Sequence, residues 1–197
     1  MKQNSGILFD KKGKRKYFTQ QERVLIEKAA AKFPREIRTL IGVLSYTGCR
    51  ISEALALTSD RVDFDEGVIV FESLKKRQRG VFRAVPVPPK LLDTLELVHS
   101  LRETQEGGKR KNKVLLWKMS RAGAWRKIRD VMIAAGVDGG PKLSPKGLRH
   151  GFGVAAVTVG IPLNLVQRWL GHAQLTTTAI YADAVGAEEK KIAERMW

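Results

Sequence analysis

The chain has little of the features that mark secreted, membrane-embedded or zinc-bound proteins. Its 197 residues include one cysteine, Cys49, which excludes an intramolecular disulfide and a cysteine-rich zinc site. It has no run of about 18 apolar residues that could span a bilayer, and its first residues, MKQNSGILFD, lack the apolar core of a signal peptide. It also lacks a glycine-rich phosphate loop and an acidic metal cluster. These absences predict a cytoplasmic protein with no membrane partner, no cofactor and no metal.

Acidic residues are scarce beside basic ones, with 20 Asp and Glu against 36 Lys and Arg. The net charge of +16 and the pI near 10.2 indicate a polyanionic partner, and nucleic acid fits that charge better than a membrane surface. The length and the hydrophobic content of 43% suit one domain with a sizeable core. We therefore expect one globular domain that binds a nucleic acid.

The hydrophobic pattern predicts a mainly helical α+β domain with a small antiparallel three-stranded sheet. The strands are expected at 62–64, 68–71 and 81–87. Helices are expected at 19–33, 34–47, 90–103, 122–135 and 162–170, with others beginning at Arg50, after Ser144 and before Tyr181. The helix 122–135 should bury the apolar stripe Trp125, Ile128, Val131 and Met132.

The domain is placed at residues 17–186, with a terminal segment on each side. Residues 1–16 carry six basic side chains and one acid, which predicts a flexible tail that is either solvated or in contact with phosphates. Residues 187–197 form a tail of helical pattern. The basic loop 105–113 and a set of cations around the 122–135 helix are likewise either phosphate contacts or solvated: Arg121, Arg126, Lys127 and Arg129.

The segment 144–181 holds the residues with the most distinctive chemistry. Ser144 can cap a helix whose first position is Pro145, and Lys146 and Arg149, three apart, then share a face. Further along, His172 and Tyr181 lie nine residues apart across a helix start. A guanidinium, an ammonium, an imidazole and a phenol together suit a phosphate and an oxygen nucleophile.

Three motifs in order resemble those of the tyrosine recombinases, or phage-type integrases. The first arginine box appears as Thr47–Glu53 (TGCRISE), the second as Lys146–His150 (KGLRH), and the Leu-Gly-His motif as Leu170–His172, nine residues before Tyr181. The resemblance covers roughly residues 17–186 and implies the catalytic-domain fold of that family. Within the first box, Glu53 is expected to orient its surroundings, and a simple surface ion pair between Arg50 and Glu53 is the competing interpretation.

The resemblance also implies a catalytic lysine on the hairpin after the second strand. Lys75 is the first choice, and Lys76 stays open because the register of a hairpin cannot be set from one sequence. Lys146 stands where the family more often has histidine; a lysine with an ordinary pKa of about 10.4 is a poor base, so we expect it to donate to the phosphate. His150 is expected to be structural and is left out of the reacting set.

The implied activity is cutting and rejoining double-stranded DNA through a covalent 3′-phosphotyrosine within a tetramer. By resemblance, Arg50 and Arg149 hold the phosphate, Tyr181 attacks, Lys75 protonates the leaving oxygen and His172 donates to the phosphate. The chain resembles the short members of the family that lack an N-terminal clamp domain, such as the invertases of fimbrial switches. Docking of the C-terminal tail on its own domain or on a neighbouring protomer stays open. The alternatives are a type IB topoisomerase-like relaxing enzyme and an inactive DNA-binding accessory protein.

Overall fold

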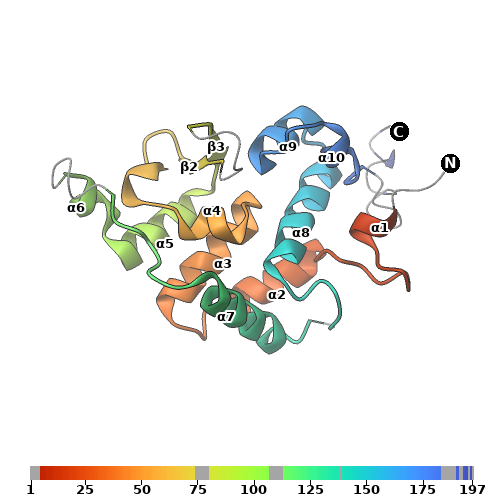
Figure 1. The fold of residues 1–197 in the computed structure, drawn as a ribbon, viewed down its shortest axis with the longest axis horizontal. Helices are drawn as coiled ribbons and strands as arrows, with labels where there is room; N and C mark the ends of the chain where they lie inside the picture. The colour runs from red at the N-terminus through yellow and green to blue at the C-terminus, as the bar shows by residue number, and fades with distance from the viewer. Residues whose placement is uncertain are drawn as a thin grey trace.

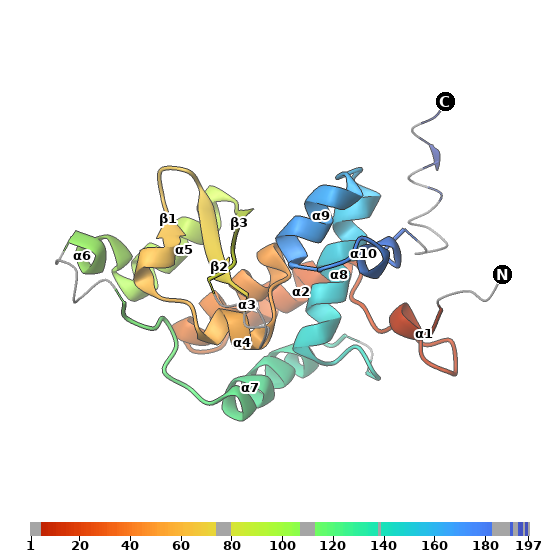
Figure 2. The same ribbon diagram turned by 45° about the horizontal axis from the view of Figure 1, so that its top comes forward.

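The computed structural model describes residues 5–73, 80–106, 113–137, 139–182, 190, 193–194 and 196. Figures 1 and 2 show a helical domain with one small sheet, as the sequence predicts. The elements follow in the order α1 (Ser5–Leu8), α2 (Gln20–Ala30), α3 (Arg35–Thr47), α4 (Ile51–Leu55), η1 (Ser59–Arg61), β1 (Val62–Asp63), β2 (Val68–Glu72), β3 (Phe82–Pro86), α5 (Pro89–His99), α6 (Leu101–Glu106), α7 (Arg121–Ala134), α8 (Pro145–Thr158), α9 (Leu163–Leu170) and α10 (Thr176–Ala179). Among these described residues, no helix is both long and apolar enough to cross a membrane.

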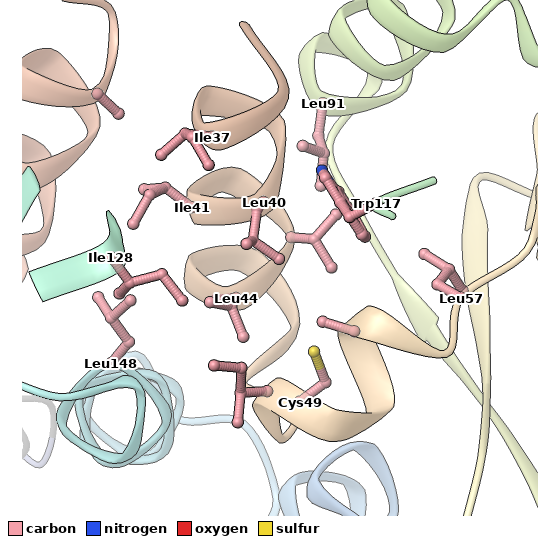
Figure 3. Close-up of a cluster of buried hydrophobic side chains, with 14 of the residues drawn as sticks. Ile37, Leu40, Ile41, Leu44, Cys49, Leu57, Leu91, Trp117, Ile128 and Leu148 are labelled. Carbon is pink, nitrogen blue, oxygen red and sulfur yellow. The ribbon is translucent and has the colours of Figure 1, made fainter. Parts of the chain in front are cut away.

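Helix α3 is the centre of the core. Its apolar side chains recur at the i, i+3, i+4 and i+7 spacing that forms one face of a helix, and all four are buried: Ile37, Leu40, Ile41 and Leu44. Side chains from the surrounding elements close over this face, as Figure 3 shows for Leu91, Trp117, Ile128 and Leu148. Because α3 is held in the core along its length, its C-terminal end fixes the position of the segment that follows it.

That exit is a left-handed turn at Gly48. Gly48 has φ 60°, and its N–H donates to the Leu44 carbonyl at 3.1 Å, which closes the last turn of α3. A Cβ at this position would lie 2.6 Å from Phe152 Cδ1 and 2.8 Å from Leu170 Cδ2. The turn therefore needs glycine both for its backbone angle and for its close approach to α8 and α9, and it places Arg50 directly before α4.

The sheet has the order β1-β2-β3, and both pairings are antiparallel. In the second pairing, Ile69 lies opposite Val85 and Phe71 lies opposite Arg83. All four of these side chains are buried, so one face of the sheet packs on the core. The predicted strands are confirmed to within two residues at each end.

Helices α8, α9 and α10 form the opposite end of the molecule from α5 and α6 (Figures 1 and 2). The predicted start of α8 is confirmed, since Ser144 Oγ accepts from the Gly147 N–H at 3.3 Å and Pro145 occupies the first helical position. Helix α9 starts after Pro162 and ends at Gly171, with φ 66°. The start of α8 and the end of α9 thus bring Arg149 and His172 to the same hollow.

The structure differs from the sequence-based prediction at two helices. The helix expected at 90–103 is divided into α5 and α6 at Ser100, which has φ 48° and ends α5 with a left-handed residue. On α7, Ile128, Val131 and Met132 are buried as predicted, but Trp125 is 39% exposed. Its indole lies outside the core because it forms part of a surface hollow.

The N-terminal segment also differs from the flexible tail expected for residues 1–16. From Ser5 onward the chain forms α1 and an antiparallel bridge between Phe9 and Arg15. Leu8 and Tyr17 are buried in the small apolar cluster that also contains Tyr181. Burial of these two apolar side chains holds the segment against the end of the domain formed by α8 and α10.

Replacing Gly48 by alanine tests the importance of the turn after α3. Gly48→Ala combines left-handed strain with overpacking against Phe152 and Leu170, so we expect unfolding in urea to show a loss of about 2–5 kcal/mol. Gly67→Ala is the matched control: Gly67 has φ 67°, but a Cβ there would meet nothing within 4 Å, and only about 1–2 kcal/mol should be lost. Equal losses in the two variants would show that the close approach at Gly48 contributes nothing.

Candidate active site

Five of the six residues singled out in the sequence line one surface hollow of about 680 Å³: Arg50, Lys146, Arg149, His172 and Tyr181. They come from the start of α4, from α8, from the turn after α9 and from the residues just after α10. The sixth, Lys75, lies outside the described residues, as does Lys76. In the part of the chain that the structure describes, the lining of the hollow contains the cations Arg50, Arg121, Lys146 and Arg149 and no carboxylate. Such a hollow suits an anion.

Arg50 is held by Glu53, one turn further along α4. The Arg50 backbone N–H donates to Glu53 Oε2 and its Nη1 donates to Oε1, each at 2.8 Å. The side chain of Arg50 is 35% exposed whereas that of Glu53 is 1% exposed. The pair is therefore more than a surface ion pair, because its carboxylate is part of the protein interior. This geometry agrees with the orienting role expected for Glu53.

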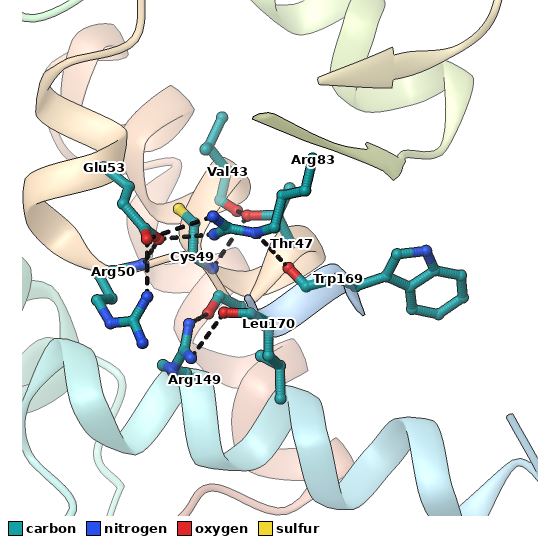
Figure 4. A network of polar contacts seen from close by, with 10 residues as sticks. Val43, Thr47, Cys49, Arg50, Glu53, Arg83, Arg149, Trp169 and Leu170 are labelled. Carbon is teal, nitrogen blue, oxygen red and sulfur yellow. Dashed lines mark hydrogen bonds and ion pairs between the residues drawn. The ribbon is translucent and has the colours of Figure 1, made fainter. Parts of the chain in front are cut away.

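Arg83 of β3 is the second partner of the same carboxylate (Figure 4). Its Nη2 donates to Glu53 Oε2 at 2.7 Å and its Nη1 to Oε1 at 3.3 Å. Its Nε donates to the Trp169 carbonyl at 2.7 Å. Burial raises the pKa of Glu53, but the hydrogen bond and charge of Arg83, together with Arg50, outweigh it and lower the pKa below its ordinary value.

Arg83 is not among the site residues expected from the sequence, although the sequence contains a signal for it. Arg83 has the same parity along its strand as Val85, and both face the core. A cation at a strand position whose neighbours on the same face are apolar indicates a buried counter-charge. That charge is Glu53, so the sheet contributes directly to the support of Arg50.

Arg149 is fixed by two backbone carbonyls. Its Nη1 donates to the Gly48 carbonyl and its Nη2 to the Leu170 carbonyl, both at 2.8 Å. Burial, with the nearby charge of Arg50, lowers the pKa of Arg149 to about 10, so the guanidinium is still charged at neutral pH. A guanidinium has five N–H donors, and these two bonds leave others for an anion in the hollow.

Tyr181 follows α10 and is 1% exposed. Its ring stacks on His172 with centroids 6.2 Å apart, and its hydroxyl lies 3.1 Å from His150 Nδ1. Burial raises the pKa of the Tyr181 phenol, while the charges of Arg149 and Arg50 partly oppose the rise. The phenol is therefore protonated at rest.

His172 is oriented by a threonine from α10. Its Nδ1 lies 2.9 Å from the hydroxyl of Thr178, which is fully buried. The residue before α10 is Leu175, which makes no side-chain cap bond. Thr178, within α10, holds the imidazole.

Comparison with known proteins places the chain in a family. The sequence pattern of the phage integrase family matches residues 16–187, and the chain belongs to this family. It is 31% identical over 165 residues to the tyrosine recombinase XerA of Pyrococcus furiosus, covering 80% of this chain and 54% of the relative. It is 27% identical over 179 residues to the tyrosine recombinase XerD of Vibrio cholerae, covering 87% of this chain and 58% of the relative. The chain thus spans about half the length of these curated relatives.

Solved structures confirm the fold. A crystal structure of XerA recombinase superposes with a TM-score of 0.76 and 25% identity, covering 91% of this chain and 64% of that chain. The XerH site-specific recombinase bound to a palindromic difH substrate gives a TM-score of 0.72 at 22% identity, covering 91% of this chain and 52% of that chain. The tyrosine recombinase catalytic-domain fold is therefore confirmed.

Neutralising Glu53 tests the buried support of the two arginines. Glu53→Gln leaves the buried guanidinium of Arg83 without its counter-charge, so unfolding in urea at pH 7 should show a loss of about 3–5 kcal/mol. Because the folded-state pKa of Glu53 is lowered, the stability from its charge is present above about pH 4.5 and is lost as the pH falls through the lowered pKa. The difference between wild type and Glu53→Gln should therefore shrink below pH 4.5.

The matched control is Glu66→Gln, which removes an exposed carboxylate from the turn between β1 and β2 and should change stability by about 0.5 kcal/mol at most. A deficit of Glu53→Gln that stays constant down to pH 3 would contradict the charge-based explanation.

Proposed function

We propose that this chain is the catalytic unit of a site-specific DNA recombinase that cuts and rejoins strands through a covalent 3′-phosphotyrosine. The observation that carries the proposal is the hollow in which two anchored guanidiniums, Arg50 and Arg149, lie with the phenol of Tyr181. Each guanidinium is held on the protein side, Arg50 by Glu53 and Arg149 by the carbonyls of Gly48 and Leu170. Donors that are fixed before the substrate arrives stabilise developing negative charge with little reorganisation.

In the proposed reaction, Arg50 and Arg149 bind the non-bridging oxygens of the scissile phosphate. The Tyr181 oxygen forms a bond to phosphorus and the bond from phosphorus to the 5′ oxygen breaks, so the phosphate remains on the enzyme. The phenol releases its proton to solvent, and the 5′ oxygen gains a proton that Lys75 supplies by resemblance to the family. His172 donates to a phosphate oxygen, and Lys146, exposed at the edge of the hollow, adds a positive charge.

Cys49, which carries a second nucleophilic atom type, is also among the residues around the hollow. Burial, as the largest effect, raises the pKa of this thiol to about 12. A thiol attacks as its thiolate, and at neutral pH that form is almost absent here. Tyr181 is therefore the proposed nucleophile, and Cys49 is a core residue that packs beneath α4.

The proposed partners are double-stranded DNA and further copies of the chain in a tetrameric synapse, and the proposed location is the cytoplasm. The exposed cations beside the hollow support the DNA partner, with Arg121 in its lining and Arg126 and Arg129 on the same helix. The likeness to the XerH recombinase, whose structure contains its difH substrate, agrees with this partner.

Covalent trapping tests the nucleophile. On a nicked suicide substrate, wild-type protein should form a DNA adduct that survives denaturing electrophoresis, and Tyr181→Phe should form none because it lacks the attacking oxygen. The control is Tyr46→Phe, whose phenol donates to Glu27 outside the hollow and whose loss should leave the adduct unchanged. An adduct formed by Tyr181→Phe in the same yield as by wild type would refute the assignment.

Salt dependence tests the DNA-binding surface. The logarithm of the binding constant should fall linearly with the logarithm of the salt concentration, by about 0.9 for each phosphate neutralised. Arg121→Gln should reduce that slope by about 0.9, because it removes one exposed cation from the lining of the hollow. Lys28→Gln, at a separate hollow beside Val24 and Thr94, should leave the slope unchanged. A slope that is equally altered by both substitutions would contradict the proposed surface.

A further inference from the structure

His150 lies next to Arg149 on α8, and its ring contacts the nucleophile. Its Nδ1 is 3.1 Å from the Tyr181 hydroxyl, and the two ring centroids are 5.8 Å apart at an angle of 56°. Both side chains are buried, and both line the hollow that holds the two arginines. The other nitrogen, Nε2, is buried without a hydrogen-bond partner in the described part of the chain. The contact with Tyr181 is thus the polar interaction that the structure gives to this ring.

The same face of α8 also receives the ring of Tyr181. Gly153 lies three residues after His150 and shares its helix face. A Cβ at Gly153 would come within 2.6 Å of the Cε2 and Cζ atoms of Tyr181, so the ring packs directly on the helix backbone. Tyr181 therefore packs on α8 at two residues: its ring lies against Gly153, which has no side chain to block it, and its hydroxyl contacts His150.

The charge state of His150 decides what the contact can do. Burial, followed by the charges of Lys146, Arg149 and Lys16, lowers the pKa of His150 to about 4, so the imidazole is neutral at pH 7. The charged groups whose fields reach Tyr181 are Arg149 and Arg50, and guanidiniums only donate. In the tautomer that carries its proton on Nε2, the Nδ1 of His150 is therefore available to accept the hydroxyl proton of Tyr181.

His150 is poorly suited to remove that proton. The pKa of the Tyr181 phenol lies above its ordinary value of 10.0, whereas that of His150 is about 4. Proton transfer from the resting phenol to this imidazole is thus unfavourable by a factor of more than about 10⁶. A hydrogen bond that does not transfer its proton can still fix the direction of the hydroxyl and leave an oxygen lone pair facing the hollow.

We propose that His150 is a positioning residue for the nucleophile: Nδ1 accepts a hydrogen bond from the Tyr181 hydroxyl and, with Gly153 beneath the ring, holds the phenol oxygen at the wall of the phosphate hollow. This inference rests on the proposed function and deepens it, because it adds to the reaction a residue that does not touch the phosphate.

The test uses two substitutions that differ in where they place a polar atom. His150→Asn puts an amide near the position of Nδ1, whereas His150→Leu fills the space without a polar atom. In single-turnover cleavage of the suicide substrate, His150→Leu should be slowed about 100-fold, the cost of a misplaced reacting group. His150→Asn should stay within about 5-fold of wild type, and both variants should bind DNA with unchanged Kd.

The pH profile separates positioning from proton transfer. Because His150 stays neutral, the cleavage rate of wild type and His150→Asn should have the same shape between pH 6 and 9. Loss of an inflection in the variant would show that His150 titrates in the reaction and would overturn the proposal. Equal rates for His150→Leu and wild type, or equally slow rates for the folded Leu and Asn variants, would also overturn it.

A measurement without DNA keeps this inference separate from the proposed function. In protein labelled with ¹³Cζ-tyrosine, the resonance of Tyr181 is assigned by its absence in Tyr181→Phe. It should shift in His150→Leu and shift less in His150→Asn, whether or not the chain cleaves any DNA tested. An unchanged resonance in His150→Leu would show that the hydrogen bond does not exist, even if wild type forms the covalent adduct.

Discussion

The site depends on one buried carboxylate that two guanidiniums share. Glu53 is 1% exposed, and a carboxylate so far from water is costly unless its charge is matched and its oxygens are bonded. Arg50 alone could not meet this need, because its side chain reaches out to the hollow. Arg83 from the sheet provides the remaining bonds, one to each oxygen. The small sheet thus supports the candidate site as well as the packing, because it carries the cation that lets Glu53 hold Arg50.

The arginines also complete the C-terminal ends of two helices. The last carbonyls of a helix have no partner inside it, and at the end of α9 each of the last four carbonyls is bonded from outside the regular pattern. The His172 N–H donates to the Gln167 carbonyl and the Gly171 N–H to the Arg168 carbonyl. Arg83 donates to the Trp169 carbonyl and Arg149 to the Leu170 carbonyl. The negative end of the helix dipole favours this arrangement. The hydrogen bonds from Arg83 and Arg149 to these carbonyls therefore both hold the two cations and cap α9.

The sequence was sufficient for features that depend on local patterns. The core face of α3, the cap at Ser144 and the turn at Gly48 follow from spacing and residue type over a few positions, and the structure confirms them. Contacts between distant segments were not visible: Arg83 meets Glu53 from 30 residues away, and His150 meets Tyr181 from 31 residues away. Trp125 was misassigned because a periodic pattern shows which residues share a face but not where the core ends. In the candidate site, the residues that line the hollow were predictable, whereas the distant residues that hold them in place were not.

The position of Tyr181 is determined by packing rather than by the helix before it. Helix α10 has four residues, and a helix that short has little stability of its own. What holds the tyrosine is the burial of Thr178, Ile180 and its own ring against α8. The ring of Tyr181, the proposed nucleophile, thus packs on the helix that carries Arg149, so the phenol and one of the two cations proposed to bind the phosphate share a support. In the proposed reaction such a support is useful, because a misplacement of the reacting groups by about 1 Å can slow a reaction about 100-fold.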